Sequence, residues 1–220
     1  MILNLQFFGG RGASAGDGGT PGGGGDLNSN WTGNVGGRVY EDKAEALGKQ
    51  GRPKGIENAT LQANPNYNPE YSEFSENCQR CVIAYEARRR GYDVVAHPTY
   101  EGDTMSYGSN YLSNFEGAQE KNVGATTRGK VLSNVQKEMA SYGDGSRGII
   151  AVQWSGANYG HVFNCEQVGD KTIFRDAQTG KYYKPENVFS KVRPGSVRLT
   201  RVDNLEFSDT VGQAVTKDKI

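Results

Sequence analysis

A helical pattern in the middle of the 220-residue chain gives way to short strands in its second half. Apolar side chains recur at helical spacing from Asn77 to the three arginines before Gly91, and again over 127–142. After the break at 143–145, branched and aromatic residues fall into short runs between glycine-bearing turns. Helices first and antiparallel strands afterwards predict the α+β fold class. The expected strands cover 148–154, 161–168, 171–175 and 196–202.

Apolar density divides the chain into four parts. It is highest over 64–209, a length typical of one domain with its own core. Residues 1–26 are so rich in glycine and poor in apolar side chains that burial cannot offset the entropy of ordering them, which predicts a flexible, disordered leader. We expect 27–63 to be an irregular or partly ordered linker and 210–220 to be a C-terminal tail.

Charge and cysteine content narrow the functional classes. The 25 basic and 25 acidic side chains balance, so no overall field favours binding to nucleic acid or to an anionic membrane. The apolar start, 1–8, lacks a cationic flank and is too short to span a bilayer, so we expect neither signal peptide nor anchor. Three cysteines fit no disulfide framework. A protein made in a cytoplasm, with its thiols reduced, is the expectation.

Cys78 is the candidate nucleophile. It opens the predicted helix, where backbone amides without helical partners carry partial positive charge and favour a thiolate over a thiol. The amide of Cys78 also points toward the place where a developing oxyanion would lie. His161 is on a predicted strand, and it is the candidate base.

The expected hairpin supplies the third group. If 169–170 form a two-residue turn, Val168 lies opposite Lys171, and Asp176 lies diagonally across from His161 on the same sheet face. A carboxylate at that place can hold a histidine ring in one orientation. The sequence therefore predicts a nucleophile, a base and an orienting acid, whereas it leaves the docking of the helix against the hairpin open.

Other interpretations of the cysteines stay open at this point. Cys78 and Cys81 could be small apolar residues on a buried helix face. A Cys-x-x-Cys pair at a helix start is also typical of thioredoxin-like proteins, but here a polar, proline-bearing segment precedes it. A zinc site would need His161 and Cys165, which four residues of strand separate by roughly 13 Å. We therefore expect no metal and no cofactor.

Three blocks of the sequence, taken in order, resemble one known family. They are NCQRCVIAYEARRRGYDVVA from Asn77, the strand 152–154 followed by GHVF, and FRDAQTG from Phe174 with RVDNL from Arg201. Together they resemble the papain-fold toxin family described as glutamine deamidases, over about 64–209. Such domains occur in polymorphic bacterial toxins and at the ends of minor head proteins of phages and prophages.

The resemblance implies a papain-like fold, in which the helix that carries the nucleophile packs on an antiparallel sheet. Carried to matching positions, it makes Cys78 the nucleophile, His161 the general base and acid, and Asp176 the orienting carboxylate. The implied enzyme is a cysteine-dependent hydrolase that converts protein glutamine to glutamate through a thioester.

Further candidates for oxyanion or substrate contacts are Asn77, Gln178 and Trp154. Asn77 could equally be only a helix cap. The family's Asp-Pro-Gln pattern reads Asp-Ala-Gln here, because Ala177 replaces the usual proline, and Asn164-Cys165 replaces a pair that is commonly Ala-Glu. We expect Cys165 to be a packing residue. No glutamine precedes the nucleophile as it does in papain proteases.

The implied partner is a glutamine-bearing protein substrate, and a phage particle or an immunity protein are further candidates. The start, NLQFFGG from Asn4, also resembles structural proteins of phages and mobile elements. A phage- or mobile-element-encoded effector is therefore the expectation, located in the cytoplasm of the producing bacterium or associated with a virion. Peptidase and transglutaminase activities would use the same triad, and a virion structural module could retain the fold without activity.

Overall fold

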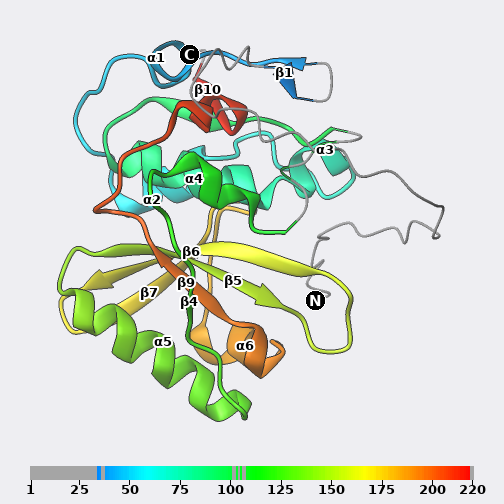
Figure 1. Cartoon of the computed structure of the whole chain (residues 1–220), viewed down its shortest axis with the longest axis vertical. Helices are drawn as coiled ribbons and strands as arrows, with labels where there is room; N and C mark the ends of the chain where they lie inside the picture. Colours follow the sequence, from blue (N-terminus) through cyan, green and yellow to red (C-terminus); the bar gives the residue numbers. More distant parts are fainter. Residues whose placement is uncertain (1–33, 36–37, 101–102, 104, 106–107, 219–220) are drawn as a thin grey trace, which may run out of the picture.

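The computed structural model describes residues 34–35, 38–100, 103, 105 and 108–218, and it has a helical layer packed on an antiparallel sheet (Figure 1). The long helix α4, Cys78–Arg89, lies between the sheet and the outer segments near the two ends of the described chain. The predicted leader, 1–26, lies outside the described residues. The α+β prediction is confirmed.

Helix α4 begins and ends where the sequence predicts. Asn77 precedes it, and the chain leaves it through Gly91, whose φ is 103°. A Cβ atom at Gly91 would lie 2.4 Å from the carbonyl oxygen of Gly51, so both the backbone angle and the space require glycine. Nearly every residue of α4 is buried, including charged ones such as Arg80 and Glu86. The helix is therefore the centre of the molecule and not an amphipathic surface element.

The sheet has six antiparallel strands in the order β4-β9-β5-β6-β7-β8. Their bounds are Lys121–Asn122 (β4), Arg147–Gln153 (β5), Gly160–Val168 (β6), Lys171–Asp176 (β7), Lys181–Tyr182 (β8) and Arg198–Arg201 (β9). Strand β9 is shorter than expected, because Pro194–Ser196 forms a 3-10 turn, η3. The hydroxyl of Ser196 accepts a hydrogen bond from the amide of Gln153 at the end of β5.

The predicted hairpin register is confirmed. Val168 pairs with Lys171 across a turn in which Gly169 has a φ of 57°, and the pairing continues to Asn164 opposite Arg175. Asp176 is the last residue of β7 and also pairs with Lys181 of β8. The hairpin thus delivers His161 and Asp176 to the same end of the sheet.

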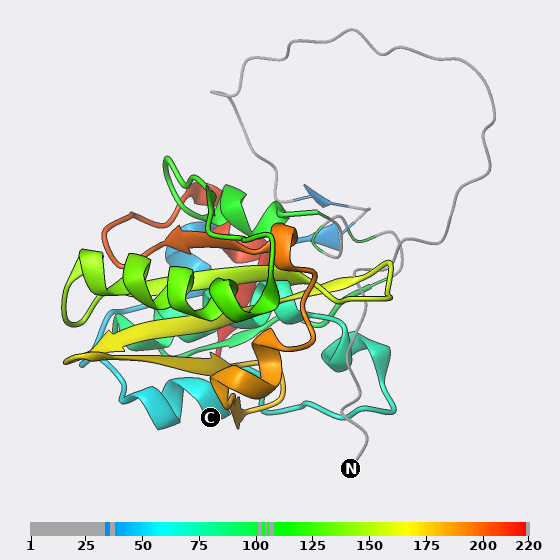
Figure 2. The same cartoon turned by 90° about the horizontal axis from the view of Figure 1, so that it is seen from below.

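Two apolar clusters fill the molecule, one on each side of the sheet. The first surrounds α4 and includes Ile83, Tyr85 and Val162. The second lies under α5, Arg128–Tyr142, and α6, Pro185–Phe189. Seen from below, these two helices lie in front of the strands (Figure 2).

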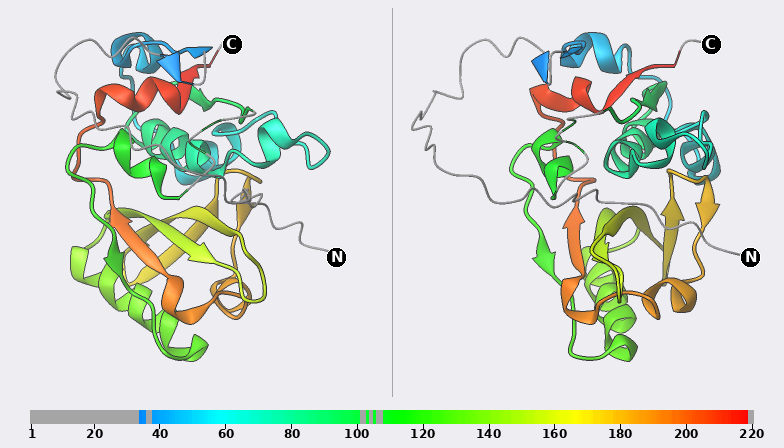
Figure 3. Two further views of the ribbon diagram at one scale, coloured as in Figure 1. Left: turned by 45° about the vertical axis from the view of Figure 1, so that its right-hand side comes forward. Right: turned by 90° about the vertical axis from the view of Figure 1, so that its right-hand side faces the viewer.

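The chain on either side of the predicted domain also contributes to the fold. Helices α1, Lys43–Leu47, and α2, Ile56–Gln62, bury small apolar side chains in the first cluster. Strand β10, Val215–Lys217, pairs with β3, Val94–Ala96. Both views of Figure 3 place α1 and β10 above α4, with the sheet below it. The remaining short elements are β1 (Asn34–Val35), β2 (Arg38–Val39), α3 (Ser72–Ser75), η2 (Asn110–Asn114) and η4 (Asp209–Gln213).

The predicted linker, 27–63, and tail, 210–220, therefore differ from the described structure over 40–63 and 210–218. Each element in these segments is too short to show a sustained apolar period, and each buries only a few side chains. Their order comes from contacts with α4 and β3 that sequence spacing does not reveal.

Candidate active site

Cys78 is the first residue of α4 and is buried, with 4% of its surface exposed. The start of the helix faces the end of the sheet where β6 begins and β7 ends, because Asn77, directly before α4, contacts Gln178 in the turn after β7. Backbone amides in the first turn of a helix have no helical acceptor, and they present partial positive charge beside the thiol.

His161 and Asp176 meet at this end of the sheet. The Nε2 atom of His161 lies 3.3 Å from Oδ1 of Asp176, and both side chains are buried. Oδ2 of Asp176 accepts hydrogen bonds from the hydroxyls of Thr179 and Tyr183, each at 2.7 Å. The amide of Gln178 donates to Oδ1 at 3.1 Å. Four donors therefore hold this carboxylate in one orientation.

The pKa values of the pair move in opposite directions. Burial alone raises the pKa of Asp176, but the charge of His161 and the hydrogen bonds from His161, Thr179 and Tyr183 outweigh burial and lower it below its ordinary value. Burial alone lowers the pKa of His161, but the charge of Asp176, the hydrogen bond to it and the neighbouring Cys78 raise it to about 10. The site thus favours an imidazolium beside an ionised carboxylate.

The second ring nitrogen of His161 is the one available to the thiol. Nδ1 is buried and has no hydrogen-bond partner among the residues that the structure describes. Because Nε2 faces Asp176 and Cys78 influences the pKa of the ring, Nδ1 is the nitrogen that a proton of Cys78 could reach. This arrangement brings the three candidates from one helix and one hairpin together.

Aromatic rings enclose the imidazole. Trp154 stacks on His161 with ring centroids 6.3 Å apart and an interplanar angle of 22°, and Tyr183 packs edge-on at 6.4 Å. Phe163 stacks beneath at 6.1 Å. Trp154, a candidate for oxyanion or substrate contact, is therefore placed beside the base, and its buried Nε1 has no partner within the described part of the chain.

Asn77 and Gln178, the other two candidates, lie together behind the helix start. The Asn77 side chain does not cap α4; its Nδ2 donates to the carbonyl of His97 and to Oδ1 of Asn64. Its Oδ1 lies 3.4 Å from Nε2 of Gln178, and it accepts from the thiol of Cys81 at 3.1 Å. Asn64 also donates to the carbonyl of Gln178 at 2.9 Å. This buried amide cluster ties α4 to the turn after β7.

The other two cysteines lie in packing positions. Cys165 is buried in the second apolar cluster, with its sulfur 3.5 Å from that of Met139. Burial raises the pKa of both Cys81 and Cys165, which favours the neutral thiol. No group of three or more His, Cys, Asp or Glu side chains in the described residues is arranged to hold a metal ion.

Sequence reasoning missed Thr179 and Tyr183. Thr179 follows Asp176 by three residues in a glycine-bearing turn, a spacing at which hydroxyl-to-carboxylate contacts are common, so it could have been found. Tyr183 comes from the residue after β8, and only the pairing of β8 with β7 returns it to the site. No local pattern predicts that return.

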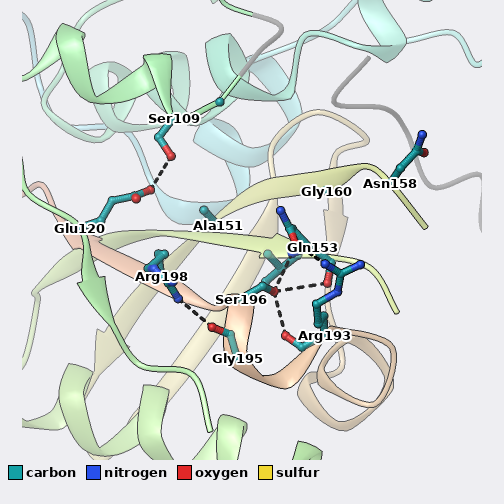
Figure 4. Close-up of a pocket in the computed structure, with 12 residues that line it drawn as sticks. Ser109, Glu120, Ala151, Gln153, Asn158, Gly160, Arg193, Gly195, Ser196 and Arg198 are labelled. Atoms are coloured by element: carbon teal, nitrogen blue, oxygen red, sulfur yellow. Dashed lines mark hydrogen bonds between the residues drawn. The ribbon is translucent and has the colours of Figure 1, made fainter. Parts of the chain in front are cut away.

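A groove of about 480 Å³ begins beside the site (Figure 4). Its walls include Gly160, which precedes His161, and Gly108, whose carbonyl accepts from Nε2 of Gln79, the residue after Cys78. Its floor is formed by β5 and β9, where Ala151 pairs with Arg198. The groove therefore extends across the face of the sheet from Gly160, next to His161 in the sequence, to Ser109 and Glu120.

The helix-on-sheet arrangement is that of a papain-like α+β fold. Residues 76–181 match the model of the family described as papain fold toxin 1, glutamine deamidase. No curated protein and no solved structure matches the chain. Among the described residues, no helix has the length and apolar character needed to cross a membrane.

Proposed function

We propose that the protein is a cysteine-dependent deamidase of glutamine side chains in a target protein, with Cys78, His161 and Asp176 as its catalytic residues. The observation that carries the proposal is the position of His161, which is bound to Asp176 through Nε2 and coupled to Cys78 on its other side. The family's description as glutamine deamidases of the toxin type supports the choice of substrate.

The first half of the reaction forms a thioester. The Cys78 thiolate attacks the side-chain carbonyl carbon of a glutamine, and negative charge develops on the oxygen, which the amide of Cys78 at the helix start is placed to stabilise. The tetrahedral intermediate collapses when the protonated His161 gives its proton to the departing nitrogen. Ammonia leaves, and the acyl group remains on sulfur.

The second half releases glutamate. A water molecule gives a proton to the now neutral His161 and attacks the thioester carbonyl. Collapse of this intermediate breaks the carbon–sulfur bond and regenerates the thiolate beside the imidazolium. The sum is glutamine and water to glutamate and ammonia. Asp176, held by four donors, keeps the ring oriented for both transfers.

The test compares the wild-type protein with Cys78→Ala and with Cys165→Ala as the matched control. Ammonia release is measured from a small derivative of glutamine, and proteins exposed to the enzyme are analysed for the small mass gain of glutamine deamidation. We expect release by the wild type and by Cys165→Ala, and none by Cys78→Ala.

Three other outcomes would overturn this function. Cleaved peptide bonds would identify a peptidase, and incorporation of an added amine into glutamine side chains would identify a transglutaminase. If Cys78→Ala retained every biological effect of the wild type, the domain would be a structural module.

We also propose that the protein is an effector encoded by a phage or mobile element, acting in the bacterial cytoplasm or carried on a virion. The resemblance of the sequence start and the toxin family support this origin. Expression in a bacterial host should arrest growth with the wild type but not with Cys78→Ala. Equal growth arrest by both would contradict a catalytic effector.

A further inference from the structure

The groove beside the candidate site has an uneven charge distribution. Arg193 lies at one end of the groove, and Glu120 lies toward the other end, just before β4, where Asn122 pairs with Arg198 of β9 (Figure 4). Glu120 accepts hydrogen bonds from the hydroxyls of Ser109 and Tyr111, which fix its carboxylate at that end. A bound segment would therefore meet positive charge at the Arg193 end and negative charge at the Glu120 end.

The two arginines have no carboxylate partner in the described part of the chain. Arg193 donates to the side-chain oxygen of Gln153 at 3.0 Å and to the carbonyl of Ala157 at 3.4 Å. Arg198 donates to Oδ1 of Asn122 and to the carbonyl of Gly195, both at 3.0 Å. Neutral acceptors orient both guanidinium groups and leave their charge uncompensated.

Arg193 is the groove arginine that contacts the loop before His161. Its contact at Ala157 lies in the loop 155–159, which leads directly into Gly160 and His161. Arg193 is exposed, and η3 holds its backbone, whose amide donates to the carbonyl of Gln153 at 2.7 Å. A positive charge is thus held at the end of the groove that adjoins the loop leading to His161.

We propose that this groove binds the segment of the target protein that carries the glutamine, and that Arg193 selects an acidic side chain near that glutamine. The proposal rests on the proposed deamidase function and specifies its substrate. Charge complementarity is the argument for an acidic side chain at Arg193: a carboxylate there satisfies an uncompensated cation, whereas an acidic side chain at the far end of the groove meets Glu120. Arg198 adds to the positive field along the floor.

The experiment uses peptides that contain one glutamine and differ in a single neighbouring residue, placed at each of the two positions before and after it. Glutamate, serine and lysine are compared there by ammonia release. We expect kcat/KM for the best glutamate peptide to exceed that of its lysine counterpart by roughly five- to tenfold, mainly through KM. The preference should weaken with added salt.

Variants of Arg193 test the assignment. Arg193→Gln should abolish the preference, Arg193→Glu should reverse it, and Arg193→Lys should restore most of it. Lys137→Gln is the matched control, because Lys137 is exposed on α5, across the sheet from the groove. Each variant should release ammonia from the small glutamine derivative at the wild-type rate.

The readouts separate this proposal from the function on which it rests. Absence of Cys78-dependent release from the small derivative would refute the deamidase function. Normal release with no difference among the peptides, or the same preference in Arg193→Gln, would refute the acidic subsite alone. A short single-stranded oligonucleotide that bound the wild type but not Arg193→Gln would assign the groove to a nucleic acid instead.

Discussion

At the scale of single residues, the geometry around Asp176 explains how a buried pair of charges is maintained. A carboxylate taken out of water is stable only if its oxygens are satisfied, and four donors satisfy them here. Tyr183 remains a donor because burial and the charge of Asp176 raise its pKa well above the ordinary value. The imidazole of His161 is consequently held through Nε2, the ring nitrogen that faces Asp176 and not Cys78.

Asp176→Asn tests the charge of the carboxylate. The variant keeps the size of the side chain but removes the charge that raises the pKa of His161, so burial dominates and that pKa falls from about 10. We expect deamidation to slow by about two orders of magnitude. An NMR titration of His161 and ammonia release together provide the measurement. An unchanged titration would contradict the coupling.

Tyr183→Phe tests the hydrogen bond to Oδ2. Removal of one donor of four should slow deamidation by about three- to tenfold, in line with the loss of a hydrogen bond to a charged group. Tyr182→Phe is the control, since the neighbouring Tyr182 is exposed and stacks with Arg175. Equal rates for both variants would show that Tyr183 has no positioning role.

At the scale of elements, α4 is held by its polar residues as much as by its apolar ones. Glu86 is fully buried and pairs with Arg90 at 2.7 Å and with Arg147 of β5 at 2.8 Å. Arg89 pairs with Glu166 of β6 at 2.6 Å, and the hydroxyl of Tyr85 donates to the same carboxylate. The arginines that signal the end of the helix in the sequence thus also attach it to the sheet.

Glu86→Gln should destabilise the fold. The change leaves two partly buried guanidinium groups without their counter-charge, which costs about 3 kcal/mol. Glu186→Gln, at an exposed position of α6, should leave stability within about 0.5 kcal/mol of the wild type. The free energy of unfolding in urea measures both, and equal values would argue against the attachment.

At the scale of the whole molecule, local patterns predicted the central fold and the candidate site. The helix start at Cys78 and the hairpin register from Val168 to Lys171 follow from spacing and turn chemistry, so His161 and Asp176 could be placed together from the sequence. The docking of α4 on the sheet and the contact of Tyr183 with Asp176 could not be predicted, because they depend on contacts between distant segments. Strand β10 was missed for the same reason.

Val215→Ala tests whether the domain extends beyond residue 209. Val215 is fully buried in the first cluster, so removal of its two methyl groups should cost about 2 kcal/mol of stability. Lys217→Ala, two residues further along the same strand and exposed, is the control. Identical urea midpoints for Val215→Ala and wild type would show that 210–218 is a dispensable tail.

The raised pKa of His161 also predicts how stability varies with pH. A group whose pKa is higher in the folded than in the unfolded protein stabilises the fold below its unfolded pKa, and this contribution is lost as pH rises toward about 10. Wild type should therefore lose more stability than His161→Gln between neutral pH and pH 10. Parallel loss in both proteins, measured in urea, would contradict the shift.

The division of the three candidate residues between a helix and a later hairpin has a consequence during synthesis. Cys78 emerges from the ribosome long before His161 and Asp176, and the hairpin that carries them must close before the imidazole is oriented. A nascent or truncated chain carries a thiol without its base. The proposed chemistry is thereby withheld until both α4 and the hairpin have been synthesised and have packed together.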